Sequence, residues 1–219
     1  MDGQLITIEG IDGSGKGTQA KLLADELSAR GIATKLYSFP SYNSTFFGRE
    51  VGAYLRGEFG TIDEVHPKLA SVLFAGDRFE KKEQIERDLA NGRIVICDRY
   101  TNSNIAHQCA KMNRTNHPEF INWIQTLEYE VLGLPRPDRI FFLDIPPEIA
   151  RTLVLKKSER DYTASKEDIH EESYSYIEKV HEAYRNLSHL EDWTVIECMR
   201  MGEVLSINEI NRKLISFFI

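Results

Sequence analysis

The residues from Gly10 to Thr18 read Gly-Ile-Asp-Gly-Ser-Gly-Lys-Gly-Thr, which are the types and spacing of a phosphate-binding loop. Glycines at positions 10, 13 and 15 allow a tight turn that points backbone N–H groups at an anion. Lys16 stands where a mobile cation reaches the outer phosphates of a nucleotide. The alternative is a chance glycine-rich turn.

The neighbouring residues have the patterns that a phosphate loop requires. The run Leu5–Glu9 is strand-like and Thr18–Ala29 is helix-like, so the loop joins a buried strand to the start of a helix. A helix that begins near Lys16 adds the positive end of its dipole. Strand, loop and helix therefore agree on phosphate binding.

Gly17 departs from the usual loop pattern, which has Ser or Thr at that position to hold Mg²⁺. Thr18 follows one residue later. Either Thr18 bonds a phosphate while water and carboxylates hold the metal, or the metal is coordinated differently. Mg²⁺ readily keeps several waters, so a site with few protein ligands is chemically reasonable.

A second group of polar residues follows the apolar run 94–97, where Asp98 and Arg99 end a predicted strand. Ligands bind at this carboxyl edge in open α/β sheets. Asp98 is therefore predicted to hold Mg²⁺ or its waters, and Arg99 to bridge phosphates. The alternative is an ordinary salt bridge at the end of a strand.

Phe74 and Arg78 are four residues apart on a predicted helix and so share one face. A ring that stacks on a base beside a guanidinium that donates to a carbonyl such as thymine O4 would suit nucleobase recognition. Arg78 would oppose the amino group of cytosine. A core phenylalanine beside a surface arginine is the alternative, and the pattern alone favours it.

The segment Phe39-Pro40-Ser41-Tyr42 follows the second predicted strand, again at the ligand edge of the sheet. The hydroxyl of Tyr42 is placed to bond a substrate phosphate. An ordinary strand-to-helix loop is the alternative, and the segment by itself favours it.

Strand-like and helix-like runs alternate along the chain, which predicts an α/β fold with a parallel sheet covered on both faces. The predicted strands are Leu5–Glu9, Thr34–Phe39, Ile94–Asp98, Arg139–Asp144 and Trp193–Glu197. The predicted helices are Thr18–Ala29, Ser44–Arg56, Pro67–Asn91, Ser103–Lys111, Glu119–Leu132, Pro147–Lys157, Lys166–Leu190 and Val204–Phe217.

The composition narrows the function classes. The 219 residues are 42% hydrophobic with a formal net charge of -7 and no Lys/Arg-rich run, so neither nucleic acid nor a membrane is expected as a partner. The 3 cysteines are widely spaced, which is typical of reduced thiols in a cytoplasmic protein. We expect one domain over 1–219, no targeting segment, and a mobile lid at 156–166.

Taken in order, the motifs resemble the thymidylate kinase family over nearly the whole chain. They are Glu9-Gly10-Ile11-Asp12-Gly13-Ser14-Gly15-Lys16, Phe39-Pro40-Ser41-Tyr42, Gly57-Glu58-Phe59-Gly60, Leu73-Phe74-Ala75-Gly76-Asp77-Arg78, Asp98-Arg99-Tyr100, Ser103-Asn104-Ile105-Ala106-His107-Gln108 and Leu143-Asp144-Ile145-Pro146-Pro147-Glu148. The resemblance implies a three-layer P-loop NTPase-type fold with a five-stranded parallel sheet and a short lid.

The resemblance assigns roles at the monophosphate site. Phe74 matches the ring that stacks on thymine, Arg78 the donor to thymine O4, and Asn104 an amide that reads the base edge. Asp12 resembles the carboxylate near the sugar and phosphate, and Arg99 the arginine that bridges phosphates. The full set is Asp12, Phe39, Pro40, Tyr42, Phe74, Arg78, Arg99, Asn104, His107 and Gln108.

The donor side carries the second set of implied roles. Gly10, Ile11, Asp12, Gly13, Ser14, Gly15, Lys16, Gly17 and Thr18 would bind ATP, and Asp98, Thr18 and Asp168 would support Mg²⁺, mostly through water. The family places a catalytic cation in the loop or in the lid; Gly13 fills the loop position, so the lid residues Lys156, Lys157 and Arg160 are the candidates. Catalysis is then assigned to Asp12, Lys16, Arg99, Lys157 and Arg160, with Asp168 and Glu171 organising the lid.

The implied activity is ATP- and Mg²⁺-dependent phosphorylation of dTMP to dTDP by a homodimer. Gly17-Thr18-Gln19 is more similar to adenylate kinase, which is the nearest alternative, and His107 stands where some relatives carry an aromatic residue that excludes a ribose 2′-hydroxyl. A nucleotide-binding regulatory protein without transfer activity is the alternative of another class.

Overall fold

Five parallel strands form the central sheet of the computed structural model, which describes residues 3–61, 64–158, 174–190 and 193–218. The strands are β1 (Gln4–Glu9), β2 (Thr34–Ser38), β3 (Ile94–Asp98), β4 (Arg139–Asp144) and β5 (Thr194–Glu197), and their spatial order is β2-β3-β1-β4-β5. The predicted five-stranded parallel sheet is confirmed, and β1 lies at its centre.

The central strand is apolar because both of its faces are covered. Leu5 packs with Val95 and Cys97 of β3 in one cluster, while Ile6 and Ile8 belong to the larger core on the other side. Side chains alternate along a strand, so neighbours in sequence enter different clusters. This burial fixes the register that brings the carboxyl ends of β1 and β3 together.

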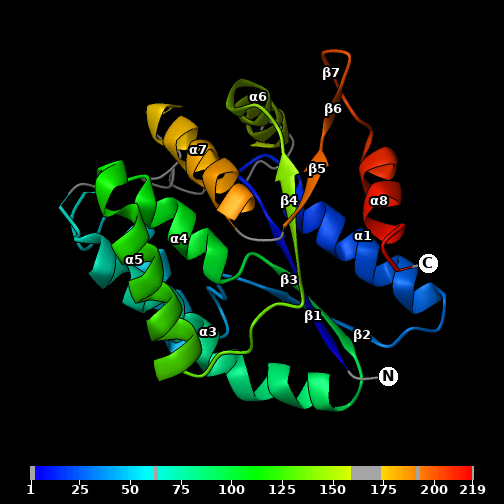
Figure 1. Ribbon diagram of the computed structural model, residues 1–219, viewed down its shortest axis with the longest axis horizontal. Helices are drawn as coiled ribbons and strands as arrows, with labels where there is room; N and C mark the ends of the chain where they lie inside the picture. The colour runs from blue at the N-terminus through cyan, green and yellow to red at the C-terminus, as the bar shows by residue number, and fades with distance from the viewer. Residues whose placement is uncertain (1–2, 62–63, 159–173, 191–192, 219) are drawn as a thin grey trace.

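Helices form the two outer layers (Figure 1). They are α1 (Lys16–Ala29), α2 (Phe46–Leu55), α3 (Pro67–Ala90), α4 (Thr101–Cys109), α5 (His117–Gln125), α6 (Pro147–Ser158), α7 (Tyr174–Leu190) and α8 (Ile207–Ile215). The α1 and α8 helices pack together on one side of the sheet, and α3, α4 and α7 lie on the other (Figure 1). A 3₁₀ turn, η1 (Arg114–Asn116), precedes α5, and a π-helix, η2 (Thr126–Val131), follows it.

Beyond shifts of a few residues at helix ends, the described structure differs from the predicted elements mainly near α5, α6 and α8. A small hairpin of β6 (Met199–Arg200) and β7 (Glu203–Val204) precedes α8, so the prediction of helix from Val204 is wrong at its start. The predicted helix Glu119–Leu132 is split into α5 and η2. The α6 helix continues to Ser158, so the first residues of the predicted lid are helical, and the rest of 156–166 lies outside the described residues.

The loops after β1, β2 and β3 meet at one edge of the sheet. β1 leads into the glycine-rich loop, β2 into the segment from Phe39, and β3 into Arg99. These are the loops that the sequence predicted to carry ligand-binding residues. Within the described ranges, no helix combines the length and apolar character that a bilayer crossing needs.

Candidate active site

The glycine-rich loop has the backbone of an anion cradle. Gly13 and Gly15 have φ angles of +83° and +87°, which glycine adopts readily, and Ser14 donates its N–H to the Ile11 carbonyl at 3.2 Å. The α1 helix starts at Lys16, and in the described structure no side chain caps it. Its first N–H groups are therefore left for an external acceptor such as a phosphate.

Gly13 is glycine because helix α6 lies directly against the loop. A Cβ at this position would come within 2.2 Å of the Ala150 carbonyl oxygen and 2.9 Å of a methyl group of Val154. No larger side chain fits without moving α6. The sequence inference that this loop lacks a catalytic arginine thus has a steric cause.

Lys16 is held under the loop and is 6% exposed. Its Nζ donates to the Ile11 carbonyl at 2.7 Å and lies 3.9 Å from Oδ1 of Asp12. Burial and the nearby Arg99 guanidinium lower the pKa of Lys16 to about 8, although Asp12 and Asp98 oppose the shift. An anion bound nearby would therefore stabilise the charged form of Lys16 and raise its pKa.

Arg99 connects the loop to helix α4. Its Nη2 donates to Oδ1 of Asp12, while Nη1 lies 3.3 Å from Oγ of Ser103 and 3.2 Å from Nε2 of His107. Burial alone would disfavour both charges, but their mutual attraction prevails and raises the pKa of Arg99 while it lowers that of Asp12.

The backbone of Arg99 has an uncommon conformation for a residue other than glycine. Its φ of 66° lies in the left-handed region, which costs a residue with a side chain about 1–3 kcal/mol. The Arg99 N–H donates to the Ile8 carbonyl at 3.1 Å, so the end of β1 holds this conformation in place. Such strain is typical of a residue that must direct its side chain into a site.

The Asp98 carboxylate lies next to the unusual residue at position 17. A Cβ on Gly17 would lie 2.9 Å from Oδ2 of Asp98, which also accepts a hydrogen bond from Oγ of Ser38 at 3.3 Å. The other oxygen, Oδ1, is buried and has no partner among the described residues. The carboxylate thus borders the space that the side chain of a loop serine or threonine would enter. Its Oδ1 is an acceptor that a ligand can use.

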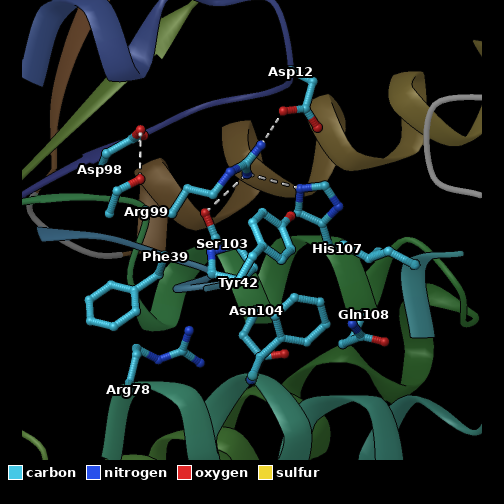
Figure 2. A pocket seen from close by; sticks show the side chains of 14 residues that line it. Asp12, Phe39, Tyr42, Arg78, Asp98, Arg99, Ser103, Asn104, His107 and Gln108 are labelled. Atoms are coloured by element: carbon cyan, nitrogen blue, oxygen red, sulfur yellow. Dashed lines mark hydrogen bonds and ion pairs between the residues drawn. The ribbon is translucent and has the colours of Figure 1, made fainter. Parts of the chain in front are cut away.

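A cavity of about 330 Å³ opens beside these groups (Figure 2). The cavity is lined by every residue that was predicted from the sequence to bind the monophosphate. They are Asp12, Phe39, Pro40, Tyr42, Phe74, Arg78, Arg99, Asn104, His107 and Gln108. Asp98 also lines it, as do Ser38, Leu55 and Ser103, which the sequence did not single out. Asp12, Asp98 and Arg99 lie on one side, and Arg78, Asn104 and Gln108 on the other (Figure 2).

The side of the cavity away from the loop is buried and polar. Gln108 is fully buried, and its amide oxygen and nitrogen have no partner among the described residues. Arg78 is 2% exposed, and its Nε and Nη2 donate to Oε2 and Oε1 of Glu128 at 2.7 and 2.5 Å. Unsatisfied buried groups are costly, so this wall is built for a polar ligand.

Glu128 and Asp77 are acids that the sequence reasoning missed. Asp77 accepts from the Ser41 N–H at 2.8 Å and from Oγ1 of Thr45 at 2.5 Å, and so fixes the loop that carries Phe39, Pro40 and Tyr42. Phe39-Pro40 is a cis peptide. In the sequence, Asp77 was noted only as the residue before Arg78 in a family motif. Glu128 belongs to no motif that would mark it as part of a site.

Other predicted residues do not line this cavity. Thr18, which was predicted to bind ATP and support Mg²⁺, is exposed in the first turn of α1, and its role stays a prediction. Lys157 belongs to α6, but its side chain is outside what the structure describes, as are Arg160 and Asp168 entirely. Their predicted roles in the lid and at the metal stay predictions.

The sequence of this chain is similar to proteins of one known family. The family model described as thymidylate kinase matches residues 8–205. The thymidylate kinase of Plasmodium falciparum is 30% identical over 205 residues, covering 92% of this chain and 85% of that protein. A probable thymidylate kinase of Pyrobaculum aerophilum is 31% identical over 217 residues, covering 97% and 98% respectively.

A solved structure agrees with these relatives. The thymidylate kinase of Candida albicans, an enzyme described as having broad substrate specificity, matches with a TM-score of 0.74 and 26% identity, covering 99% of this chain and 91% of that one. The family match extends from the end of β1 to the residues just before α8, and it includes the loop and the cavity. This chain belongs to the thymidylate kinase family.

Proposed function

We propose that this protein transfers the γ-phosphoryl group of ATP to thymidine monophosphate and releases the diphosphate. The observation that carries the proposal is the cavity, which joins a phosphate loop at one end to a ring, a guanidinium and an amide at the other. A nucleotide switch needs only one nucleotide site. A second site beside the loop is what an acceptor nucleotide requires.

The groups at the loop end suit phosphoryl transfer, which depends mainly on positioning and electrostatics. Lys16 and the N–H groups at the start of α1 would hold the donor phosphates. Arg99 lies between the loop and the cavity, where it can bridge the donor and the acceptor phosphate. The acceptor oxygen is already anionic near neutral pH, so no general base is assigned.

Mg²⁺ fits the same end of the cavity. The unpartnered Oδ1 of Asp98 is a hard oxygen donor in a buried position, which Mg²⁺ favours. Within the described residues no cluster of three or more acidic, cysteine or histidine side chains could hold a metal, so waters and phosphates would complete the shell. The metal would neutralise charge that develops on the phosphates.

We assign the additional catalytic cation to the end of α6 or to the residues that follow it. The support is the contact of Gly13 with Ala150, which leaves no room for a cation on the loop and places α6 directly above it. Lys157 and Arg160 follow in sequence and are the candidates, and Asp168 would act with them. Closure of this segment would exclude water and limit loss of ATP to hydrolysis.

A coupled assay with thymidine, deoxyuridine, deoxycytidine and adenosine monophosphates tests the function. We expect the highest kcat/KM with thymidine monophosphate and a strict requirement for ATP and Mg²⁺. Preference for adenosine monophosphate would overturn the proposal in favour of an adenylate kinase activity. Binding of both nucleotides without product would indicate a regulatory protein instead.

The affinity for ATP should fall at alkaline pH because of Lys16. Its pKa of about 8 in the free protein rises when phosphates bind, so binding takes up a proton above that pH. We expect the Kd for ATP to be level from pH 7 to 8 and to weaken by up to about tenfold per further unit. Calorimetry across this range measures it.

The Lys16→Arg variant is the control for this pH dependence. A guanidinium stays charged throughout the range, so any decline that comes from Lys16 should disappear. A Kd for the wild-type protein that stays constant up to pH 9.5 would contradict the prediction.

A homodimer is proposed through one face of α3. Leu69, Val72 and Phe79 lie on the same side of this helix and are 67%, 42% and 48% exposed. Light scattering should give a dimer for the wild type and a monomer for Leu69→Glu/Val72→Glu. Met201→Glu, on the distant hairpin and 99% exposed, should remain a dimer. A monomeric wild-type protein would refute the proposal.

A cytoplasmic location is proposed from the cysteines. All 3 of them are free and buried, which fits a compartment that keeps thiols reduced. Burial raises the pKa of Cys109 and Cys198 to about 12, so their thiolate forms are scarce at neutral pH.

A further inference from the structure

Glu128 accepts hydrogen bonds from side chains of two helices, α3 and α4, that border the cavity. It is fully buried in η2, 50 residues from Arg78 in sequence. Besides its two bonds from Arg78, Oε2 accepts from Oγ1 of Thr101 at 2.8 Å and Oε1 from Nδ2 of Asn104 at 2.9 Å. Every one of these partners is a donor, so the position calls for a group that only accepts.

The contact with Glu128 fixes which way the Asn104 amide points. Its Nδ2 donates to Glu128 and also to the Ser71 carbonyl at 3.1 Å, which uses both amide hydrogens. Its Oδ1 is buried and has no partner among the described residues. Since Asn104 lines the cavity, Oδ1 is the atom that it offers to a ligand, and it is an acceptor.

Arg78 presents the opposite polarity nearby. Glu128 binds Nε and Nη2, so Nη1 is the guanidinium nitrogen that can donate toward the cavity. A protein donor beside a protein acceptor matches a ligand edge that has C=O beside N–H. The imide edge of thymine or uracil has this order, whereas cytosine has an amino group beside a bare ring nitrogen.

We propose that Glu128 is the positioning residue that sets the hydrogen-bond polarity of the base-reading wall, and that it thereby selects imide bases over cytosine. The proposal rests on the proposed function and names the part of the site that determines which base is accepted. Glu128 acts through Arg78 and Asn104, and it does not line the cavity itself.

The Glu128→Gln variant tests this polarity with the smallest change in shape. A glutamine amide must turn a donor toward at least one of the present donors. Where its nitrogen meets Asn104, two donors face each other unless that amide reverses and gives up its bond to the Ser71 carbonyl. A reversed amide offers Nδ2 to the cavity, which suits the ring nitrogen of cytosine, and an amide that does not reverse is less firmly held. Discrimination between the two kinds of base should therefore decrease.

The measurement compares kcat/KM for deoxyuridine and deoxycytidine monophosphates, which differ only in the polarity of this edge. Their ratio does not depend on how much of the enzyme is folded. We expect Glu128→Gln to lower the ratio by about tenfold or more, because an unmatched buried polar group is heavily penalised. Glu128→Asp keeps an acceptor-only group and should still favour the uracil nucleotide.

Asp88→Asn is the matched control. Asp88 is another buried acid, 7% exposed, and accepts from Arg93 and from the Tyr37 hydroxyl at 2.7 and 2.8 Å, away from the cavity lining. It should lose stability without a change in the ratio. An equal fall of the ratio in Asp88→Asn, or an unchanged ratio in Glu128→Gln, overturns the proposal.

Asn104→Ala provides the second test if Glu128→Gln does not fold. It removes the acceptor that Glu128 orients and leaves the pair of Glu128 with Arg78 in place, so the ratio should again fall. An unchanged ratio would refute the role of this amide. Failure of the proposed function has a different signature, because the wild-type enzyme would then show no preference for thymidine monophosphate.

Discussion

Replacing Lys16 by methionine should lower kcat by about a thousandfold or more, the range found when a preorganised group on the transferring phosphoryl is removed. Methionine fills much of the same space, so the loop should keep its shape. The charge that develops on the γ-phosphoryl would lose its cation at the start of α1. Steady-state and single-turnover kinetics with saturating ATP measure the loss.

Lys21→Met is the control for this substitution. Lys21 lies on the same helix but is exposed and does not line the cavity, so its kcat should stay within about twofold of the wild type. Unfolding curves of both variants separate stability from catalysis. A Lys16→Met enzyme that keeps more than a tenth of the wild-type kcat would move the main stabilising charge to another residue.

The parts of the fold that depend on local pattern were predictable. β3 and β4 have the predicted bounds because continuous apolar runs end in aspartates at the sheet edge. The β6–β7 hairpin was missed because its strands have only 2 residues each, too short for any periodicity to appear. The π-helix η2 was missed because it directly follows α5 and continues the same spacing of apolar residues.

The site divides in the same way. Residues within one loop were predictable from local pattern, as in the glycine-rich loop. The pair of Phe74 and Arg78 shares one helix face, but that pattern alone favoured a core ring beside a surface arginine, and only the resemblance to the family assigned the pair to the site. The acid that holds Arg78 was not predictable, because Glu128 meets it only through tertiary packing. Gly17 is the reverse case. The sequence shows that this position departs from the usual loop pattern, but the closeness of the Asp98 carboxylate to it follows only from the pairing of β3 with β1.

The role of Arg99 follows from local sequence pattern and tertiary packing together. The sequence placed it at the end of β3, and the structure shows that it contacts Asp12, Ser103 and His107 together. Arg99→Met should lower kcat by about a thousandfold, a loss comparable with that of an arginine that stabilises transferring phosphate. It should also weaken binding of the monophosphate, because the Asp12 carboxylate would then repel it without compensation.

A double variant separates these two causes. In Asp12→Asn/Arg99→Met the repelling carboxylate is gone, so binding of the monophosphate should recover in part while kcat stays low. Arg99→Lys should restore less than a tenth of kcat, because an ammonium is a point charge and cannot reach three partners in the geometry of a planar fork. If Arg99→Lys is as active as the wild type, then charge alone suffices at this position and the contacts to Ser103 and His107 do not contribute to catalysis.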